Sequence, residues 1–234
     1  TLETFGAWSP EQNVCSPSDI AKAINPDKPL IILTFYRAFI TAADLKPIKA
    51  IFDALRIRGF EVLGLFSPSL KIPDAAEWII SQIKQFKPVC IVNATSFSGR
   101  GASGESPLDI GDVPVFQVAL STSNRAAWRE ADRGLSPADM AMHVVLPEVD
   151  GRIFAGVASF KEPGIQDKDL EFFRIEHQPD KERILAITDK VCRWYTLQTK
   201  PLEAQKAALI LSTYPGRPWQ MAHAVGLDVL ASAQ

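Results

Sequence analysis

The sequence predicts an α/β protein built on a doubly wound, mostly parallel sheet of the Rossmann or flavodoxin type. Short, continuous apolar runs at residues 30–35, 60–66 and 89–93 are typical of strands that are covered on both faces. Two segments with apolar residues at helical spacing separate these runs. The order strand–helix–strand–helix–strand favours a parallel sheet, whose crossover connections are almost always right-handed.

The two helices between these strands are indicated by their apolar stripes and by their ends. The stripes are Leu45, Ile48, Phe52 and Leu55 in the first helix, and Ala75, Ile79, Ile83 and Phe86 in the second. With Asp44 as N-cap, Pro47 falls in the first turn, where its missing N–H costs nothing, and Gly59 is expected to end the helix. Asp74 and Glu77 have the spacing of a capping box at the start of the second helix.

Further along the chain the pattern predicts more elements and a β-hairpin excursion. The expected elements are a strand at residues 113–119, a helix at 124–132, a short helix starting at Ser136 and a long helix capped by Asp180. Residues 143–148 and 152–159 have strand-like composition, and the Asp-Gly step at Asp150 is a hairpin signal. Residues 161–178 are polar and charged, which is typical of an excursion from the sheet.

The sequence predicts three segments. Residues 1–28 contain several prolines and little periodicity, so we expect a lead-in over the surface. Residues 29–200 hold the α/β domain, and residues 201–234 begin a second α/β domain with a strand at 207–211. Because the chain starts without methionine and stops within a helix-like apolar stretch, we interpret it as a segment of a longer protein.

Composition excludes several classes of function. The net charge of -2 argues against a surface for nucleic acid or anionic membranes, which needs a basic excess. The sequence has neither a bilayer-spanning apolar run nor a secretory signal. Cys15, Cys90 and Cys192 are far apart, so they predict neither a disulfide framework nor a zinc site, and a reducing cytoplasmic setting is expected.

The glycine-rich stretch from Gly99 to Ser106 resembles a phosphate-binding loop that follows a strand. Glu105 stands where such a loop has lysine, and its carboxylate would repel the phosphates. Pro107 also fits poorly with a helix whose N-terminus would face the phosphate. We therefore expect a flexible lid and no ATP site.

The histidines and nucleophiles offer no local catalytic motif. His143, His177 and His223 lack the spacing of a metal site. We expect His143 at the edge of a strand as a structural residue, and His177 in the charged excursion in contact with solvent. His223 is a candidate for metal or proton transfer because it follows a proline-glycine loop, and Cys90 is expected to be a buried apolar residue.

Candidate ligand contacts follow the predicted strands, since ligands bind beyond the carboxyl ends of such strands. These residues are Tyr36, Arg37, Ser96, Ser98, Arg100 and Arg217. Arginine offers a planar fork that is suited to carboxylates, so an acidic organic ligand is expected. The alternative is that these arginines pair with Asp109, Asp112 or other acids of the protein itself. The ligand hypothesis requires Tyr36, Ser96 and their companions to lie along one edge of the sheet and not to be buried in internal ion pairs.

A series of motifs resembles the large subunit of aerobic cobaltochelatase, the CobN type, which is related to the porphyrin-binding H subunit of magnesium chelatase. The motifs are LTFYRA at 33–38, NATSFS at 93–98, RGLSPAD at 133–139, VLPEVDGRIF at 145–154, YPGR at 214–217 and AVGLD at 224–228. The resemblance runs from about residue 29 to the end. Residues 218–223 depart from the family's usual pattern, which puts a role of that loop in doubt.

The resemblance implies ATP-dependent insertion of cobalt into hydrogenobyrinic acid a,c-diamide during cobalamin biosynthesis. It further implies that Mg-ATP is bound by separate AAA+-type subunits, that an integrin-like subunit takes part, and that cobalt is a substrate, with no cofactor in this segment. The segment alone is expected to be inactive and to grip the acidic macrocycle.

The resemblance and the strand-end pattern together suggest roles for individual residues. Arg37, Arg100 and Arg152 are candidates for the ligand's carboxylates, Ser96 and Ser98 for hydrogen bonds, and Glu148 and His223 for proton or metal handling. Two alternatives stay open: a module that docks the ATPase subunits, or the equivalent part of the large subunit of a magnesium chelatase.

Overall fold

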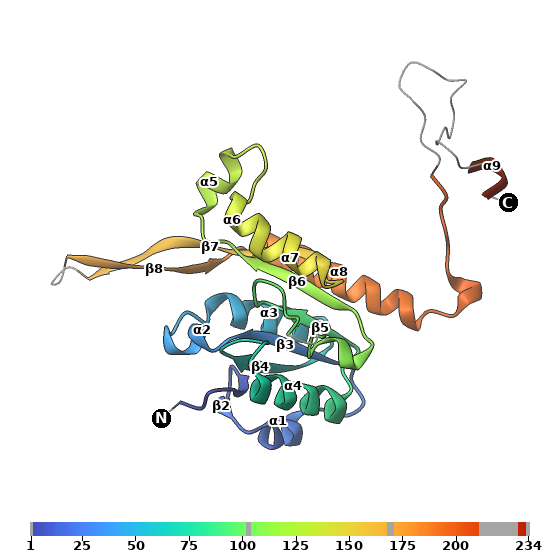
Figure 1. Cartoon of the computed structure of the whole chain (residues 1–234), viewed down its shortest axis with the longest axis horizontal. Helices are drawn as coiled ribbons and strands as arrows, with labels where there is room; N and C mark the ends of the chain where they lie inside the picture. The colour runs from blue at the N-terminus through green and yellow to red at the C-terminus, as the bar shows by residue number, and fades with distance from the viewer. Residues whose placement is uncertain (1, 102–103, 168–170, 211–228, 233–234) are drawn as a thin grey trace, which may run out of the picture. The chain divides into compact units, whose positions relative to one another are not determined.

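The computed structural model of this chain describes residues 2–101, 104–167, 171–210 and 229–232 (Figure 1). It divides into two compact units, Thr1–Tyr195 and Thr196–Gln234. The first unit contains the whole sheet. The described part of the second unit contains the last turn of the long helix α8, a short 3₁₀ turn at Leu202–Ala204 and the helix α9 (Val229–Ser232).

The first unit alternates strands with helices along most of its length. Its strands are β1 (Gly6–Ser9), β2 (Asn13–Cys15), β3 (Leu30–Tyr36), β4 (Glu61–Ser67), β5 (Cys90–Asn93), β6 (Val115–Leu120), β7 (Ile153–Asp167) and β8 (Phe172–Pro179). Its helices are α1 (Pro17–Ala23), α2 (Arg37–Thr41), α3 (Lys46–Ile57), α4 (Pro73–Phe86), α5 (Arg125–Glu130), α6 (Pro137–Met140), α7 (Leu146–Val149) and α8 (Lys181–Thr199).

These strands form one eight-stranded sheet in the order β2-β1-β4-β3-β5-β6-β7-β8. The central pairs from β4 to β7 are all parallel, and the outer pairs β1–β2, β1–β4 and β7–β8 are antiparallel. The prediction of a mostly parallel sheet in an α/β protein is confirmed. Because the central strands run the same way, the loops that follow them gather at one edge of the sheet.

Helices cover both faces of the central strands, as the continuous apolar runs require. Along β3, Ile31, Leu33 and Phe35 join one hydrophobic cluster, while Leu30 and Ile32 join another. The first cluster includes buried residues of α3 and α8, and the second includes those of α1 and α4. The predicted stripes of the two crossover helices are therefore confirmed as core.

The helix ends agree only in part with the predicted caps. Asn124 and Ser136 accept hydrogen bonds from the backbone N–H groups of Ala127 and Asp139, as N-caps do. The expected capping box at Asp74 is wrong, because α4 has Ile72 as N-cap and that side chain has no hydrogen-bonding atom. The expected cap at Asp44 is also wrong: Leu45 is the N-cap of α3, and Asp44 accepts from a distant backbone group described below.

The N-terminal segment is not a surface lead-in as predicted. Strand β1 pairs with β4, and its Ala7 and Trp8 are buried. The Trp8 ring packs edge-on against Phe35 and Phe52. Gly64 permits this approach, because a Cβ there would lie 2.6 Å from the Trp8 carbonyl oxygen. A four-residue strand among prolines gives too short a pattern for periodicity to identify.

The hairpin predicted around Asp150 is also wrong. Residues 143–148 belong to a continuous helical segment that runs through α6, a π-helical turn (Ala141–Val145) and α7. Gly151, with φ of +81°, turns the chain from this segment into β7. A short apolar run does not distinguish a strand from a partly buried helix, and residues 143–148 form the helix.

The β-hairpin lies instead in the segment predicted as a charged excursion. Strands β7 and β8 pair along most of their length as a long two-stranded ribbon (Figure 1). The β8 side chains Phe172, Phe173 and Ile175 are exposed, although they are large and apolar. An exposed apolar group on a two-stranded ribbon is a candidate contact surface.

The predicted strand at 207–211 is wrong over its described part, because residues 207–210 adopt no regular secondary structure. Leu211 and the loop that contains Arg217 and His223 lie outside the described residues. Among the helices that the structure describes, none combines the length and the apolar composition needed to cross a bilayer.

Candidate functional site

The loops after β3 and β5 meet at the carboxyl edge of the sheet, as predicted. The Tyr36 hydroxyl donates to the Ser96 carbonyl oxygen at 2.7 Å and accepts from the Ser96 backbone N–H at 3.1 Å. Two hydrogen bonds to the same residue fix the position of the loop relative to the strand end. Tyr36 and Ser96 therefore lie together, as the ligand hypothesis requires.

A surface depression of about 470 Å³ opens at this point of the edge. It is lined by Tyr36, Arg37, Ala38, Thr41, Pro68, Ser69 and Phe97, which follow β3, β4 and β5. The chain passes from β3 to β4 on one side and from β5 to β6 on the other, so the strand order reverses between the neighbours β3 and β5. Ligands of open α/β sheets bind where the strand order reverses in this way.

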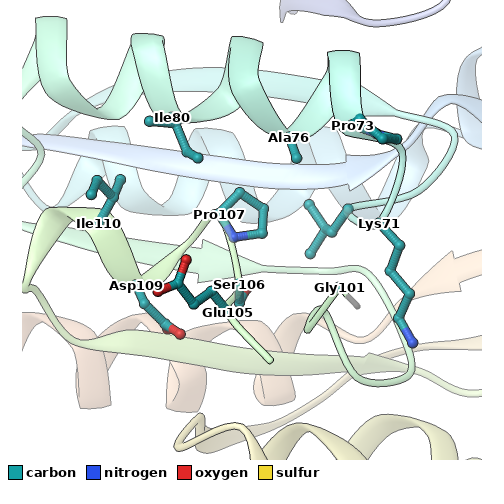
Figure 2. Close-up of a pocket in the computed structure, with 11 residues that line it drawn as sticks. Lys71, Pro73, Ala76, Ile80, Gly101, Glu105, Ser106, Pro107, Asp109 and Ile110 are labelled. Atoms are coloured by element: carbon teal, nitrogen blue, oxygen red, sulfur yellow. The ribbon is translucent and has the colours of Figure 1, made fainter. Parts of the chain in front are cut away.

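A second cavity of about 450 Å³ lies between α4 and the long loop after β5 (Figure 2). Pro73, Ala76 and Ile80 of the α4 segment form one side of it, and the loop residues Gly101, Glu105, Ser106, Pro107 and Asp109 form the other. The described residues of the glycine-rich stretch that line this cavity, Gly101, Glu105 and Ser106, thus form part of its wall. The carboxylates of Glu105 and Asp109 line the cavity, which disfavours a phosphate ligand there.

Both ends of that loop are held by the turn that follows α7. The Asp150 carboxylate accepts from Ser98 Oγ at 2.8 Å and from the Gly99 N–H at 2.6 Å, and lies 3.5 Å from Arg100 Nε. Two residues later, Arg152 Nη1 donates to Asp109 Oδ1 at 2.5 Å. Asp150 and Arg152 are 5% and 7% exposed. The predicted contact residues Ser98, Arg100 and Arg152 therefore take part in holding the loop.

The predicted arginines make contacts within the protein. Arg100 and Arg152 pair with Asp150 and Asp109, which is the alternative that the sequence left open. Arg37 lines the depression while its guanidinium donates to the carbonyl oxygens of residues 2 and 3. Buried Arg152 Nη2 has no hydrogen-bond partner in the described ranges. Arg217 lies outside them.

A buried polar chain supports the edge from beneath. Thr34 Oγ1 donates to Asn93 Oδ1 at 2.7 Å, and Asn93 Nδ2 donates to Gln117 Oε1 at 2.7 Å. Gln117 Nε2 then donates to the Thr95 carbonyl oxygen at 2.6 Å. This chain links β3, β5 and β6 and reaches the first residues of the NATSFS loop, so the loop starts from a fixed base.

A second cluster of buried polar side chains lies where the chain leaves β6. The fully buried Asp139 carboxylate accepts from Ser121 Oγ at 2.9 Å, from the Thr122 N–H at 3.0 Å and from Thr122 Oγ1 at 2.9 Å. His143 Nε2 lies 3.9 Å from the same carboxylate. His143 is thus a buried residue of the π-helical turn, and the predicted place at a strand edge is wrong.

His177 is buried, so the prediction that it contacts solvent is wrong. Its Nδ1 lies 3.1 Å from Ser159 Oγ, and its backbone N–H donates to the Asp44 carboxylate. The pKa of His177 is lowered to about 4, mainly by burial and to a smaller extent by Lys161 and His143, while Asp44 and Asp139 oppose the shift. Burial also lowers the pKa of His143. Both imidazoles are therefore neutral at pH 7.

Stability should fall as the pH falls below neutral. His177 has a lower pKa in the folded protein, about 4, than the ordinary 6.5, so the unfolded chain takes up a proton first and is favoured between these values. We expect a loss of about 2 kcal/mol in the free energy of unfolding between pH 8 and pH 5. Urea unfolding across this range measures it. A His177→Gln variant should lose less, and an equal loss would contradict the assignment to His177.

The remaining candidates are scattered. Glu148 is exposed on α7. Cys90 is buried in β5, as predicted, and burial raises the pKa of its thiol to about 12. His223 lies outside the described residues. No three His, Cys, Asp or Glu side chains are grouped to hold a metal ion within the described ranges.

The sequence reasoning missed Phe97, whose only signal was an aromatic residue between two serines after a buried strand.

The fold and this edge define an α/β domain with candidate ligand sites at the carboxyl ends of its parallel strands. Comparison with known proteins identifies the family. The chain belongs to the CobN/Magnesium Chelatase family, whose model matches residues 2–234.

Several relatives share this similarity. The chain is 31% identical to the CobN subunit of the aerobic cobaltochelatase of Sinorhizobium sp, over 97% of the chain and 19% of that protein. It is 32% identical to the same subunit from Pseudomonas aeruginosa, over 88% of the chain and 17% of that protein. It is 26% identical to the H subunit of magnesium chelatase from Rhodobacter capsulatus, over 97% of the chain and 20% of that protein.

A solved structure agrees with the fold. The catalytic subunit of cobaltochelatase from Mycobacterium tuberculosis matches with a TM-score of 0.74 and 27% identity, over 100% of this chain and 19% of that one. The chain thus spans about a fifth of the length of these relatives. The expected resemblance to the large chelatase subunits is confirmed, and the chain is homologous to a part of them.

Proposed function

We propose that this chain is the part of a cobaltochelatase large subunit that contacts the tetrapyrrole while cobalt is inserted. The depression at the point where the strand order reverses carries the proposal, because chelatases of this family handle a ring of this kind. The order β4-β3-β5-β6-β7 supports the finer description of a doubly wound, flavodoxin-like sheet. The higher identity to the cobaltochelatase subunits, 31% and 32% against 26%, favours cobalt over magnesium.

The proposed reaction of the whole protein is ATP-dependent insertion of cobalt into hydrogenobyrinic acid a,c-diamide, which forms nitrogen–metal bonds. Cobalt is a substrate, and Mg-ATP is hydrolysed on AAA+-type subunits that act with an integrin-like subunit in the cytoplasm. Insertion needs a base for the pyrrolic protons and a distorted ring. We propose that this segment binds the macrocycle and that other parts of the subunit carry out metal insertion. Glu148 and His223 remain candidates for proton or metal handling, and Arg217 remains a candidate for substrate binding.

The contacts of the edge support a division of roles. Arg37 lines the depression and offers a cation to a ligand carboxylate. Tyr36 lines the depression, and its hydrogen bonds with Ser96 fix the loop that carries Phe97. The Arg100 side chain is 44% exposed beside Asp150, and we assign it a contact with substituents of the ligand outside the depression. Ser98 and Arg152 hold the neighbouring loop.

Binding of the corrin to this chain tests the proposal. Titration with hydrogenobyrinic acid a,c-diamide in a calorimeter should give a saturable heat and a raised melting temperature. Protoporphyrin IX, the ring of magnesium chelatases, is the matched control and should bind more weakly. Stronger binding of protoporphyrin would favour the magnesium chelatase alternative, and absence of binding to either ring would overturn substrate contact by this segment.

The β7–β8 ribbon favours a second function, docking of the partner ATPase subunits. Phe172, Phe173 and Ile175 are exposed on β8, whereas apolar groups of this size are normally covered. Capture of the AAA+-type subunits by the chain, lost when Phe173 and Ile175 are replaced by serine, would support docking. Capture unchanged by these substitutions would rule out the ribbon as the contact.

A further inference from the structure

The backbone of Phe97 is held in a conformation that its side chain disfavours. Its φ is +65°, in the left-handed region, where a residue with a Cβ atom is strained. Phe97 is nevertheless 49% exposed, so burial offsets little of this strain. A strained residue that presents a large apolar group to solvent is the pattern of a binding position.

The peptides around Phe97 are fixed by partners from three other segments. The Phe97 N–H donates to the Met142 carbonyl oxygen of the π-helical turn at 2.7 Å. On one side Ser96 is bonded through both its N–H and its carbonyl to the Tyr36 hydroxyl, and on the other side Ser98 donates to Asp150. The ring is therefore attached to a backbone that is positioned before any ligand arrives. Such preorganisation reduces the entropy lost on binding.

The surroundings of the ring indicate the kind of ligand. Phe97, Tyr36 and Pro68 give the depression an apolar and aromatic part. Ser69, Thr41 and Arg37 add hydroxyl groups and a cation to its lining. A flat conjugated ring with acidic or amide substituents at its rim matches both parts, because its face stacks on an aromatic side chain and its rim accepts hydrogen bonds. The volume of about 470 Å³ lies within the range of small-molecule sites.

We propose that the Phe97 ring is a stacking platform for one face of the tetrapyrrole, with Arg37 and Ser69 bonding to substituents at its rim. The proposal rests on the proposed function and specifies a subsite for it. The left-handed backbone at Phe97 directs the aromatic group outward, and the hydrogen bonds of Ser96, Phe97 and Ser98 keep it there.

Two substitutions of Phe97 separate a binding role from a structural one. Phe97→Ala removes the ring and keeps the strain, whereas Phe97→Gly removes both. We expect each to weaken binding of hydrogenobyrinic acid a,c-diamide to this chain about tenfold, as loss of one stacking contact does. The urea midpoint of Phe97→Gly should exceed that of Phe97→Ala, because glycine tolerates the left-handed region. Phe97→Trp should retain affinity within about threefold, since the larger ring still stacks.

Ala43→Gly is the matched backbone control, because Ala43 also has a left-handed φ of +50° and does not line the depression. It should raise the urea midpoint and leave the affinity unchanged. Wild-type affinity in both Phe97→Ala and Phe97→Gly would overturn the platform and leave the proposed function standing. Failure of the wild-type chain to bind the corrin would overturn both. An equal loss of affinity in Ala43→Gly would also refute the platform, because the loss would then not depend on the Phe97 ring.

Discussion

Replacement of Asp150 by alanine is expected to lower the free energy of unfolding by about 4 kcal/mol, the largest effect of any substitution at the edge. The carboxylate is 5% exposed and receives the Ser98 hydroxyl and the Gly99 N–H. Alanine leaves that buried N–H without an acceptor and releases Arg100 from its ion pair. Urea unfolding at pH 7 measures the loss.

Glu148→Ala is the control for Asp150, because it lies two residues away in the same motif and its side chain is exposed. Its free energy of unfolding should change by no more than about 0.5 kcal/mol. Asp150→Asn keeps the shape and an acceptor for the Gly99 N–H, but it removes the negative charge and places an N–H beside the Arg100 guanidinium, so it should be clearly less stable than the wild type. A stable Asp150→Asn protein would show that the carboxylate is not needed to hold the loop.

Replacement of Asp139 by alanine is expected to cost about 3 kcal/mol of folding free energy. Its fully buried carboxylate accepts three hydrogen bonds from Ser121 and Thr122, which begin the loop after β6. Loss of that acceptor leaves these donors unpaired within the protein. Hydrogen exchange at the Thr122 amide reports the local effect, and urea unfolding reports the global one.

The control for Asp139 is Asp53→Ala on α3. Asp53 forms a surface ion pair with Lys49 one helical turn away, and such pairs contribute little. Its removal should change the free energy of unfolding by about 0.5 kcal/mol or less. If Asp139→Ala were as mild, the loop after β6 would have to be held by its other contacts, and the role assigned to Asp139 would be refuted.

The parts of the fold that the sequence predicts best are the elements with long patterns. The continuous run of β3 and the stripes of α3 and α4 have only one structural solution once both faces of the strands are covered. The N-caps Asn124 and Ser136 were predictable because a cap is a local interaction. Strand β1 and the helical segment before Asp150 were mispredicted, since their short runs depend on tertiary packing.

For the candidate site, the sequence predicted which loops meet at the edge of the sheet, because the strand topology determines this. Parallel strands bring Tyr36 and Ser96 to one edge, and these two residues do meet there. Sequence alone does not say which acid an arginine meets, so the pairing of Arg152 with Asp109, 43 residues away, could not be predicted. Phe97 was missed because the role proposed for it rests on a backbone angle and on exposure, neither of which has a sequence pattern.

The π-helical turn and the residues after it bring three supports from one stretch of chain: the Met142 carbonyl, Asp150 and Arg152. The motif that most clearly identifies the family therefore serves as scaffolding for a neighbouring loop. A substitution within it that releases this loop and a substitution that removes a reactive group would give the same result in a screen that measures activity alone. Measuring both the turnover rate and the free energy of unfolding of the same variants distinguishes the loss of a structural contact from the loss of a catalytic group.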